Sequence, residues 1–160
     1  MIYVALGSNL GDSRKLVRSA MDRIQLELDV PLVKSSLWCS LPIDCPEGSA
    51  DFVNAVVGFE ARAEQQPLDL LLQLQSMEVA FGRPAIHGYN SPRTLDLDIV
   101  CFGDRVVTST DLTIPHPRAQ ERAFVLLPLL EIAPDLIFSD SGHSVNELVG
   151  LVSSEGVRKF

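Results

Sequence analysis

The segment Ile2-Tyr3-Val4-Ala5-Leu6-Gly7-Ser8-Asn9 combines five largely apolar residues with a turn sequence. Short apolar runs that stop at Gly, Ser or Asn are typical of buried strands that run into a turn. From Asp12 to Leu28, apolar residues recur every three or four positions, and charged residues occupy the rest of the helical wheel. This spacing predicts an amphipathic helix that packs on a sheet, with Asp12 as its cap.

Two more strands and a second helix are predicted next. Leu32–Leu41 mixes β-branched, aromatic and polar residues, and Phe52–Phe59 is rich in valine, so both favour strands. Pro42–Asp51 between them contains Pro, Gly and Asp, so we expect a hairpin with a long loop. Pro67 suits the first turn of a helix, and an apolar stripe continues to Phe81. We expect this helix to pack beside the first.

The remaining elements are shorter. Arg83–Arg93 has the Gly, Pro and Asn content and the lack of periodicity of a mobile loop, and Leu95–Phe102 is the fourth predicted strand. A brief strand is expected at Arg105–Val107 and a short helix at Ala123–Ile132. Ser144-Val145-Asn146-Glu147 matches a capping box and predicts a further helix start.

The order of these elements is βαββαβ with a C-terminal extension. Two crossover helices on one face of a four-stranded, mostly antiparallel sheet close this order as a ferredoxin-like α+β sandwich. The chain has 160 residues, of which 46% are hydrophobic and 21% charged, and we expect one domain over residues 1–160. Fold alone does not define a function.

Charge and cysteine content limit the classes of partner. Thirteen basic and 21 acidic residues give a net charge of −8, which argues against nucleic acid and anionic lipid as partners. Apolar runs such as Phe124–Leu130 fall short of the ~20 residues of a membrane span, and Met1–Val4 lacks the basic start of a secretory signal. Three cysteines, Cys39, Cys45 and Cys101, show no metal-binding spacing. We therefore expect a cytoplasmic protein with reduced thiols, and a monomer.

The sharpest chemical signal is the pair Asp96 and Asp98. Residues two apart on a strand share a face, which puts these carboxylates roughly 6–7 Å apart along the backbone. An acidic pair on an exposed sheet face is the alternative without a function. The apolar residues around the pair predict a central, buried strand, where two close like charges would be costly without a cation. Hard oxygen ligands favour Mg²⁺, which usually shares its coordination sites with water and phosphates.

Basic residues lie close to this pair in the sequence. Arg83 and Arg93 bracket the predicted loop, and His116, Arg118 and Arg122 form a second group. The planar guanidinium binds phosphate oxygens bidentately. Taken singly, each arginine also fits a surface or ion-pair role, and the histidine fits a structural one. Together with the aspartates they suit a polyphosphate nucleotide with its metal ions.

Five segments then form a recognisable set: Tyr3–Asp12, Phe52–Val57, Glu78 with Gly82-Arg83, Pro92–Ile99 and Pro115–Leu129. In this order they resemble the 2-amino-4-hydroxy-6-hydroxymethyldihydropteridine pyrophosphokinases of the folate pathway. The resemblance runs from Met1 to about Leu136. It implies an enzyme that transfers the β,γ-diphosphate of ATP to the hydroxymethyl group of a reduced pterin and releases AMP.

The resemblance also implies roles for individual residues. Asp96 and Asp98 would hold two Mg²⁺ ions and, with Arg83 and Arg93, form the catalytic set. The nucleotide would meet Glu78, Arg93, His116 and Arg122. The pterin slot would consist of Pro42, Ile43, Asn54 and Phe124, with the ring against Phe124 and its polar edge at Asn54. A flat heterocycle requires an aromatic face and a few fixed hydrogen bonds, which agrees with these residue types.

The chain departs from the family pattern in three places. No Arg or Lys lies between Arg83 and Arg93, Ser91 replaces the usual Gly, and Phe52 stands where Tyr is common. One alternative is therefore a relative that binds pterin and nucleotide with weakened catalysis, although the retained Asp96 and Asp98 argue for activity. A nucleic-acid-binding module is the other alternative, and the charge of −8 argues against it.

Overall fold

The computed structural model describes residues 1–43, 45, 47–82 and 94–160. The predicted loop Arg83–Arg93, with both of its arginines, lies outside the described residues. Within the described part of the chain, none of the helices is long and apolar enough to cross a membrane.

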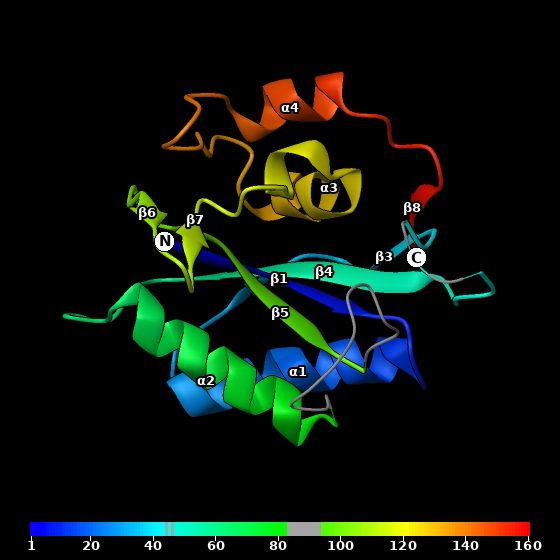
Figure 1. Cartoon of the computed structure of the whole chain (residues 1–160), viewed down its shortest axis with the longest axis horizontal. Coiled ribbons are helices and arrows are strands. Elements are labelled where there is room, and N and C mark those ends of the chain that lie inside the picture. The colour runs from blue at the N-terminus through cyan, green and yellow to red at the C-terminus, as the bar shows by residue number, and fades with distance from the viewer. Residues whose placement is uncertain (44, 46, 83–93) are drawn as a thin grey trace.

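The main sheet is antiparallel throughout, and its strands follow the order β5-β1-β4-β3-β8, with β2 also paired to β4 (Figure 1). The strands are β1 (Ile2–Ser8), β2 (Val33–Lys34), β3 (Trp38–Ser40), β4 (Phe52–Phe59), β5 (Asp96–Phe102) and β8 (Val157–Lys159). The four predicted strands correspond to β1, to β2 with β3, to β4 and to β5. Their order across the sheet is fourth, first, third and second, as the ferredoxin-like arrangement requires. The predicted strand 32–41 is split into β2 and β3, and β8 is an addition.

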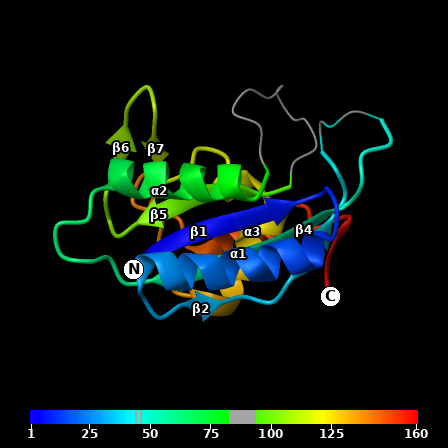
Figure 2. The ribbon, with the colours of Figure 1, turned by 90° about the horizontal axis from the view of Figure 1, so that it is seen from below.

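Both crossover helices lie on the same face of the sheet (Figures 1 and 2). Helix α1 (Ser13–Leu28) starts after Asp12, whose carboxylate accepts a hydrogen bond of 3.2 Å from the backbone N–H of Lys15. Helix α2 (Pro67–Ala80) has its proline in the first turn, where the missing N–H has no cost. Their buried side chains and those of the sheet form one apolar core. The predicted helix positions are confirmed.

A second pair of helices covers the opposite face, so the molecule has three layers (Figure 1). Helix α3 (Ala123–Ile132) has the predicted bounds, and α4 (Val145–Leu151) begins at the predicted capping box of Ser144 and Glu147. These helices pack on a second core that includes Val56 and Val100. The extension is needed because the central strands carry apolar side chains on both faces, and each face must be covered.

Strand β5 corrects one premise of the sequence analysis, because among the described strands it lies at the edge of the sheet. Its apolar residues are buried by helices above and below, which does not require strands on both sides. Past β5 the chain forms the hairpin of β6 (Val107–Thr108) and β7 (Thr113–Ile114), so the strand expected at 105–107 begins two residues later. After the hairpin, the backbone N–H of His116 donates to the carbonyl of Val100 at 2.9 Å. This bond brings a loop of cationic residues beside β5.

Candidate functional site

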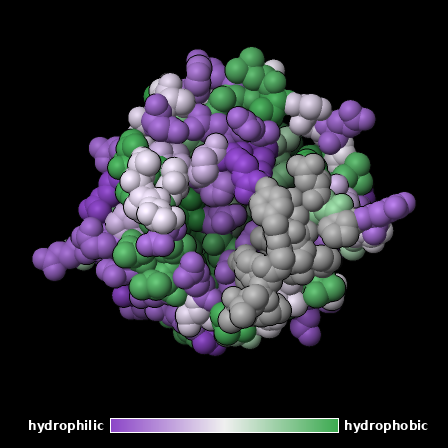
Figure 3. Space-filling view, viewed as in Figure 1, coloured by the Kyte–Doolittle hydropathy of each residue, from purple (hydrophilic) through white to green (hydrophobic). Residues whose placement is uncertain are grey.

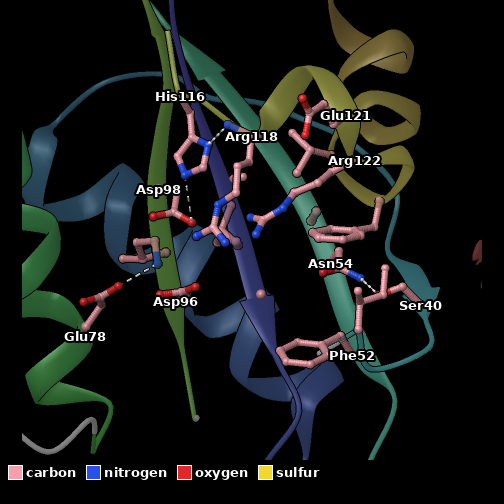
Figure 4. A pocket seen from close by; sticks show the side chains of 18 of the residues that line it. Ser40, Phe52, Asn54, Glu78, Asp96, Asp98, His116, Arg118, Glu121 and Arg122 are labelled. Carbon is pink, nitrogen blue, oxygen red and sulfur yellow. Dashed lines mark hydrogen bonds and ion pairs between the residues drawn. The ribbon is translucent and has the colours of Figure 1, made fainter. Parts of the chain in front are cut away.

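A cavity of about 520 Å³ opens beside the ends of β1, β4 and β5 and the start of α3 (Figure 4). Its described lining residues come from segments far apart in the sequence: Ala5–Gly7, Ser40, Leu41, Ile43, Cys45, Phe52, Asn54, Ala55, Leu71, Gln75, Glu78, Asp96–Asp98, His116, Arg118, Glu121, Arg122, Phe124 and Val125. The fold therefore gathers most of the described candidate residues in one place. Among the described candidates, Pro42 is the exception, since its neighbours Leu41 and Ile43 line the cavity and it does not.

One side of the cavity is acidic. Asp96 and Asp98 lie on the same face of β5. Leu97 between them points to the other face and is buried in the core formed with α1 and α2. Asp98 has 43% of its side chain exposed, so solvent as well as cations can stabilise its charge. Glu78, on α2, is 5% exposed and accepts a 2.7 Å hydrogen bond from the backbone N–H of Leu97. This carboxylate therefore fixes the last turns of α2 to the strand segment that carries both aspartates.

His116 lies next to the acidic side as a neutral ring. Burial, with Arg122 and Arg118 nearby, lowers its pKa to about 4. Its Nδ1 accepts a 3.2 Å hydrogen bond from the backbone N–H of Arg118, which places the proton of the neutral ring on Nε2. That Nε2 lies 3.9 Å from a carboxylate oxygen of Asp98. His116 thus presents a hydrogen-bond donor beside the aspartate pair.

Arg118 and Arg122 add positive charge to the middle of the cavity (Figure 4). Arg122 precedes the first residue of α3, and its guanidinium carbon is 5.4 Å from the centroid of the Phe124 ring. Arg118 was expected only as one member of a basic group, without a role of its own. Its position two residues after His116 was the signal that could have assigned it to the cavity. The Pro-rich segment runs back along β5, so residues close to His116 in the sequence lie close to the aspartates.

The other side of the cavity is a slot with one buried amide. Asn54 is 4% exposed, and its Nδ2 donates a 2.8 Å hydrogen bond to the hydroxyl of Ser40 on the neighbouring strand. Phe52 and Phe124 also line the cavity. Gly7 on β1 faces this side, where a Cβ would make ordinary contacts of 3.7 Å with the Asn54 oxygen and 3.9 Å with the Phe52 ring. Ser40 was missed because its link to Asn54 depends on strand pairing.

The described donor set fits Mg²⁺. No group of three or more His, Cys, Asp or Glu side chains comes together within the residues that the structure describes. Zinc sites commonly use such a cluster, whereas Mg²⁺ is commonly bound by one or two carboxylates plus water and phosphate. Two carboxylates at the edge of a cavity that also holds arginines meet the second description. The cavity as a whole has the layout of an enzyme that sets a polyphosphate beside a planar acceptor.

Comparison with known proteins agrees with an enzyme that sets a polyphosphate beside a planar acceptor. The family model for 7,8-dihydro-6-hydroxymethylpterin-pyrophosphokinase (HPPK) matches residues 3–134. The 2-amino-4-hydroxy-6-hydroxymethyldihydropteridine pyrophosphokinase of Pseudomonas aeruginosa is 40% identical over 160 residues, which are 99% of this chain and 96% of the relative. The enzyme of the same name from Haemophilus influenzae is 40% identical over 148 residues, covering 92% of this chain and 89% of the relative.

Solved structures show the same fold. Wild-type Plasmodium falciparum HPPK-DHPS superposes with a TM-score of 0.75 at 14% sequence identity, over 99% of this chain and 47% of the longer one. The present chain thus corresponds to less than half of that protein.

The chain belongs to the HPPK family. It is a pyrophosphokinase of folate biosynthesis, which transfers a pyrophosphoryl group from ATP to hydroxymethyldihydropterin. The family resemblance and the ferredoxin-like fold expected from the order of the elements are both confirmed.

Proposed function

We propose that this chain performs the transfer as a Mg²⁺-dependent reaction within the described cavity, with ATP at its acidic and cationic side and the pterin in the slot at Asn54. The observation that carries the proposal is the continuity of the cavity. The same space of about 520 Å³ is lined by Asp96 and Asp98 on one side and by Asn54 and Phe124 on the other. Both substrates then meet within one enclosure.

At the nucleotide side, Asp96 and Asp98 are the proposed ligands of two Mg²⁺ ions. When bound, these ions supply positive charge that offsets the charge of the phosphates. His116 offers the Nε2 proton to a phosphate oxygen, and Arg122 offers its planar fork. Glu78 lines the same side and holds the strand that carries the aspartates. Arg83 and Arg93 keep the phosphate-binding, catalytic role given by the family pattern, on residues outside the described range.

At the pterin side, Asn54 and Phe124 are the proposed contacts, with Ile43 on the outer wall. The hydrogen bond from Asn54 to Ser40 fixes the amide, so its remaining polar atoms are held for the edge of the heterocycle. Phe124 supplies the aromatic face. Pro42 belongs to the same wall in the proposal, although its neighbours Leu41 and Ile43 are the residues that line the cavity.

The chain's contribution to the reaction is placement and electrostatics. The hydroxymethyl oxygen of the pterin bonds to the β-phosphorus of ATP, the bond from that phosphorus to the α–β bridging oxygen breaks, and AMP leaves. The hydroxyl proton is lost in the process. No side-chain nucleophile is required, because holding the two groups in line and stabilising phosphate charge account for the acceleration.

We also propose that the chain acts as a cytoplasmic monomer with one domain. Cys39 and Cys101 are buried as free thiols, which suits a reducing compartment. Sedimentation velocity at micromolar concentration is expected to give one species of about the chain mass of 17.5 kDa.

The test is AMP release from ATP, Mg²⁺ and 6-hydroxymethyl-7,8-dihydropterin, followed with a coupled assay. We predict that Asp96→Asn and Asp98→Asn each lower the rate at least about 100-fold, the scale of losing one key electrostatic group. Asp104→Asn, on an exposed turn, is the matched control and is expected to keep the rate. Wild-type rates in either cavity variant at saturating Mg²⁺ would refute the metal assignment. A wild-type chain that binds both substrates without releasing AMP would favour the binding-protein alternative.

A further inference from the structure

The C-terminal strand β8 closes the sheet beside the cavity. It pairs antiparallel with β3, with Ser40 opposite Val157 and Trp38 opposite Lys159. The other edge of β3 pairs with β4, so β3 is held from both sides. The polar group nearest the slot on β3 is the Ser40 hydroxyl, which accepts the hydrogen bond from Asn54.

Gly156, the residue before β8, makes a further contact with the cavity wall. Its carbonyl accepts a 3.2 Å hydrogen bond from the backbone N–H of Leu41, the first wall residue after β3. The backbone of Gly156 has a φ of +72°, and a Cβ there would lie 2.6 Å from Cδ1 of Leu41. A side chain at this position would therefore have to displace the side chain of Leu41, which lines the cavity.

The far end of the chain is anchored to two other elements. The guanidinium carbon of Arg14 on α1 is 3.8 Å from the centroid of the Phe160 ring. Lys159 forms a 2.7 Å ion pair with Glu131 on α3, and the backbone N–H of Phe160 donates to the carbonyl of Leu37 at 3.1 Å. Residues 156–160 are thus tied to α1, α3 and β3 together.

A strand as short as β3 needs this support. It has three residues, and an irregular segment follows it that includes the wall residues Leu41, Ile43 and Cys45. Without β8, β3 would be a short edge strand, which is the kind of element that opens locally at low cost. Opening would release Ser40 and, with it, the amide of Asn54.

We infer that residues 156–160 position the pterin slot, so that the C-terminal strand sets pterin affinity without contacting the substrate. The inference rests on the proposed function, which puts the pterin at Asn54. It predicts a selective effect. Disturbing Gly156 or removing β8 weakens pterin binding and leaves nucleotide binding intact, because the acidic side of the cavity is built on β5 and the 116–122 segment.

The experiment compares Gly156→Ala with Gly142→Ala. Gly142 has a nearly identical φ of +73°, and a Cβ there would have no atom within 4 Å. Both variants therefore carry the same backbone penalty of a left-handed alanine, and Gly156→Ala alone pushes on the cavity wall. Pterin affinity is measured by calorimetry with and without a non-hydrolysable ATP analogue and Mg²⁺, and the KM values for pterin and ATP are measured by AMP release.

We expect Gly156→Ala to raise the pterin Kd and KM at least about fivefold, with the ATP KM unchanged, and Gly142→Ala to change neither. A chain that ends at Glu155 is expected to show a larger pterin defect, and its circular dichroism spectrum shows whether it is folded. Unchanged pterin affinity in Gly156→Ala overturns the inference. Asn54→Ala distinguishes failure of this inference from failure of the proposed pterin slot. If Asn54→Ala also leaves pterin affinity unchanged, the proposed slot itself is wrong and the inference falls with it.

Discussion

At the scale of single residues, Arg122 and Phe124 join the two halves of the cavity. They stand at the start of α3, and the guanidinium carbon of Arg122 lies 5.4 Å from the centre of the Phe124 ring. The same turn therefore offers a cation toward the phosphate side and an aromatic face toward the slot. A reaction that joins a polyphosphate to a planar acceptor requires these two surfaces to be neighbours.

The aromatic half of this pair gives the first prediction. Phe124→Ala is expected to raise the pterin Kd at least about tenfold by calorimetry, because the slot loses the face against which the ring lies. Nucleotide affinity is expected to change far less. Leu130→Ala is the matched control, since Leu130 lies on the same helix and packs on the same core outside the cavity. Equal losses for both ligands in Phe124→Ala would show that the residue serves packing alone.

The three cysteines differ in exposure, which gives a second prediction. Burial raises the pKa of the Cys101 thiol to about 12 and also raises the pKa of Cys39, so both remain thiols at neutral pH. Cys45 is partly exposed and lines the cavity. Because access and thiolate fraction set the rate, iodoacetamide is expected to label Cys45 first in the native chain. Peptide mass spectrometry identifies the site, and denatured chain serves as the control for full labelling.

The pterin and an ATP analogue together are expected to slow the labelling of Cys45. Labelling at an unchanged rate would mean that the occupied cavity leaves this wall open to reagent.

The sequence predicted single residues where local spacing was sufficient. Two aspartates two apart on a strand share a face whatever the topology, and the structure has them so. Among the described strands β5 lies at the edge of the sheet and not in its centre as expected, because burial by helices gives the same apolar pattern as a position between strands. Ser40 and Leu41 were not identified, since their place in the cavity depends on pairing with β4 and β8. Arg118 was expected as part of the basic group with His116 and Arg122, and a loop that returns to β5 gives it its place in the cavity.

At the scale of elements, Glu131 links α3 to the segment around β3. One carboxylate oxygen accepts a 2.7 Å hydrogen bond from the backbone N–H of Ser36, and the other lies 2.7 Å from the ammonium of Lys159. Partial burial raises the pKa of this carboxyl, but these partners outweigh the effect and leave it below its usual value of 4.5. The charged form is therefore favoured by folding.

This balance gives a prediction for acid stability. A carboxyl whose pKa is lower in the folded than in the unfolded chain stabilises the fold above the unfolded pKa, and this contribution is lost as the pH falls through the folded value. At neutral pH, Glu131→Gln is therefore expected to be less stable than wild type. Below pH 4.5, the melting temperature of wild type is expected to fall more steeply than that of Glu131→Gln. Thermal melts across pH measure both. Glu64→Gln, at an exposed position, is the control, and parallel acid limbs in wild type and Glu131→Gln would contradict the assignment.

The elements themselves were predicted well where one helix or strand carried a complete local signal. The positions of α1, α2, α3 and β4 follow from caps, a first-turn proline and apolar periodicity. The split of the second strand into β2 and β3 was missed, because Ser35, Ser36 and Leu37 do not interrupt the polar and apolar mixture. β8 was missed as well, since a three-residue strand acquires its identity only from the partner that it meets.

At the scale of the whole molecule, the cavity brings two arginines, Arg118 and Arg122, beside a carboxylate side in an acidic protein. The net charge is −8, and hydrophilic side chains predominate on the face shown in Figure 3. The overall field therefore opposes the approach of a nucleotide polyphosphate. Affinity must come from short-range contacts in the cavity, and metal ions that offset the phosphate charge would reduce the repulsion with Asp96 and Asp98.

Nucleotide is therefore predicted to stabilise the folded chain mainly when Mg²⁺ is present. A ligand at 100 times its Kd adds about 2.7 kcal/mol to the free energy of unfolding, which raises the melting temperature of a chain this size by roughly 5–10 °C. A non-hydrolysable ATP analogue with Mg²⁺ is expected to give a shift on this scale, measured by scanning calorimetry, and EDTA is expected to remove most of it. Asp98→Asn is expected to lose the Mg²⁺-dependent part, whereas Asp104→Asn keeps it. An analogue that stabilises Asp98→Asn as strongly as wild type, with the same dependence on Mg²⁺, would mean that the metal is held elsewhere than on β5.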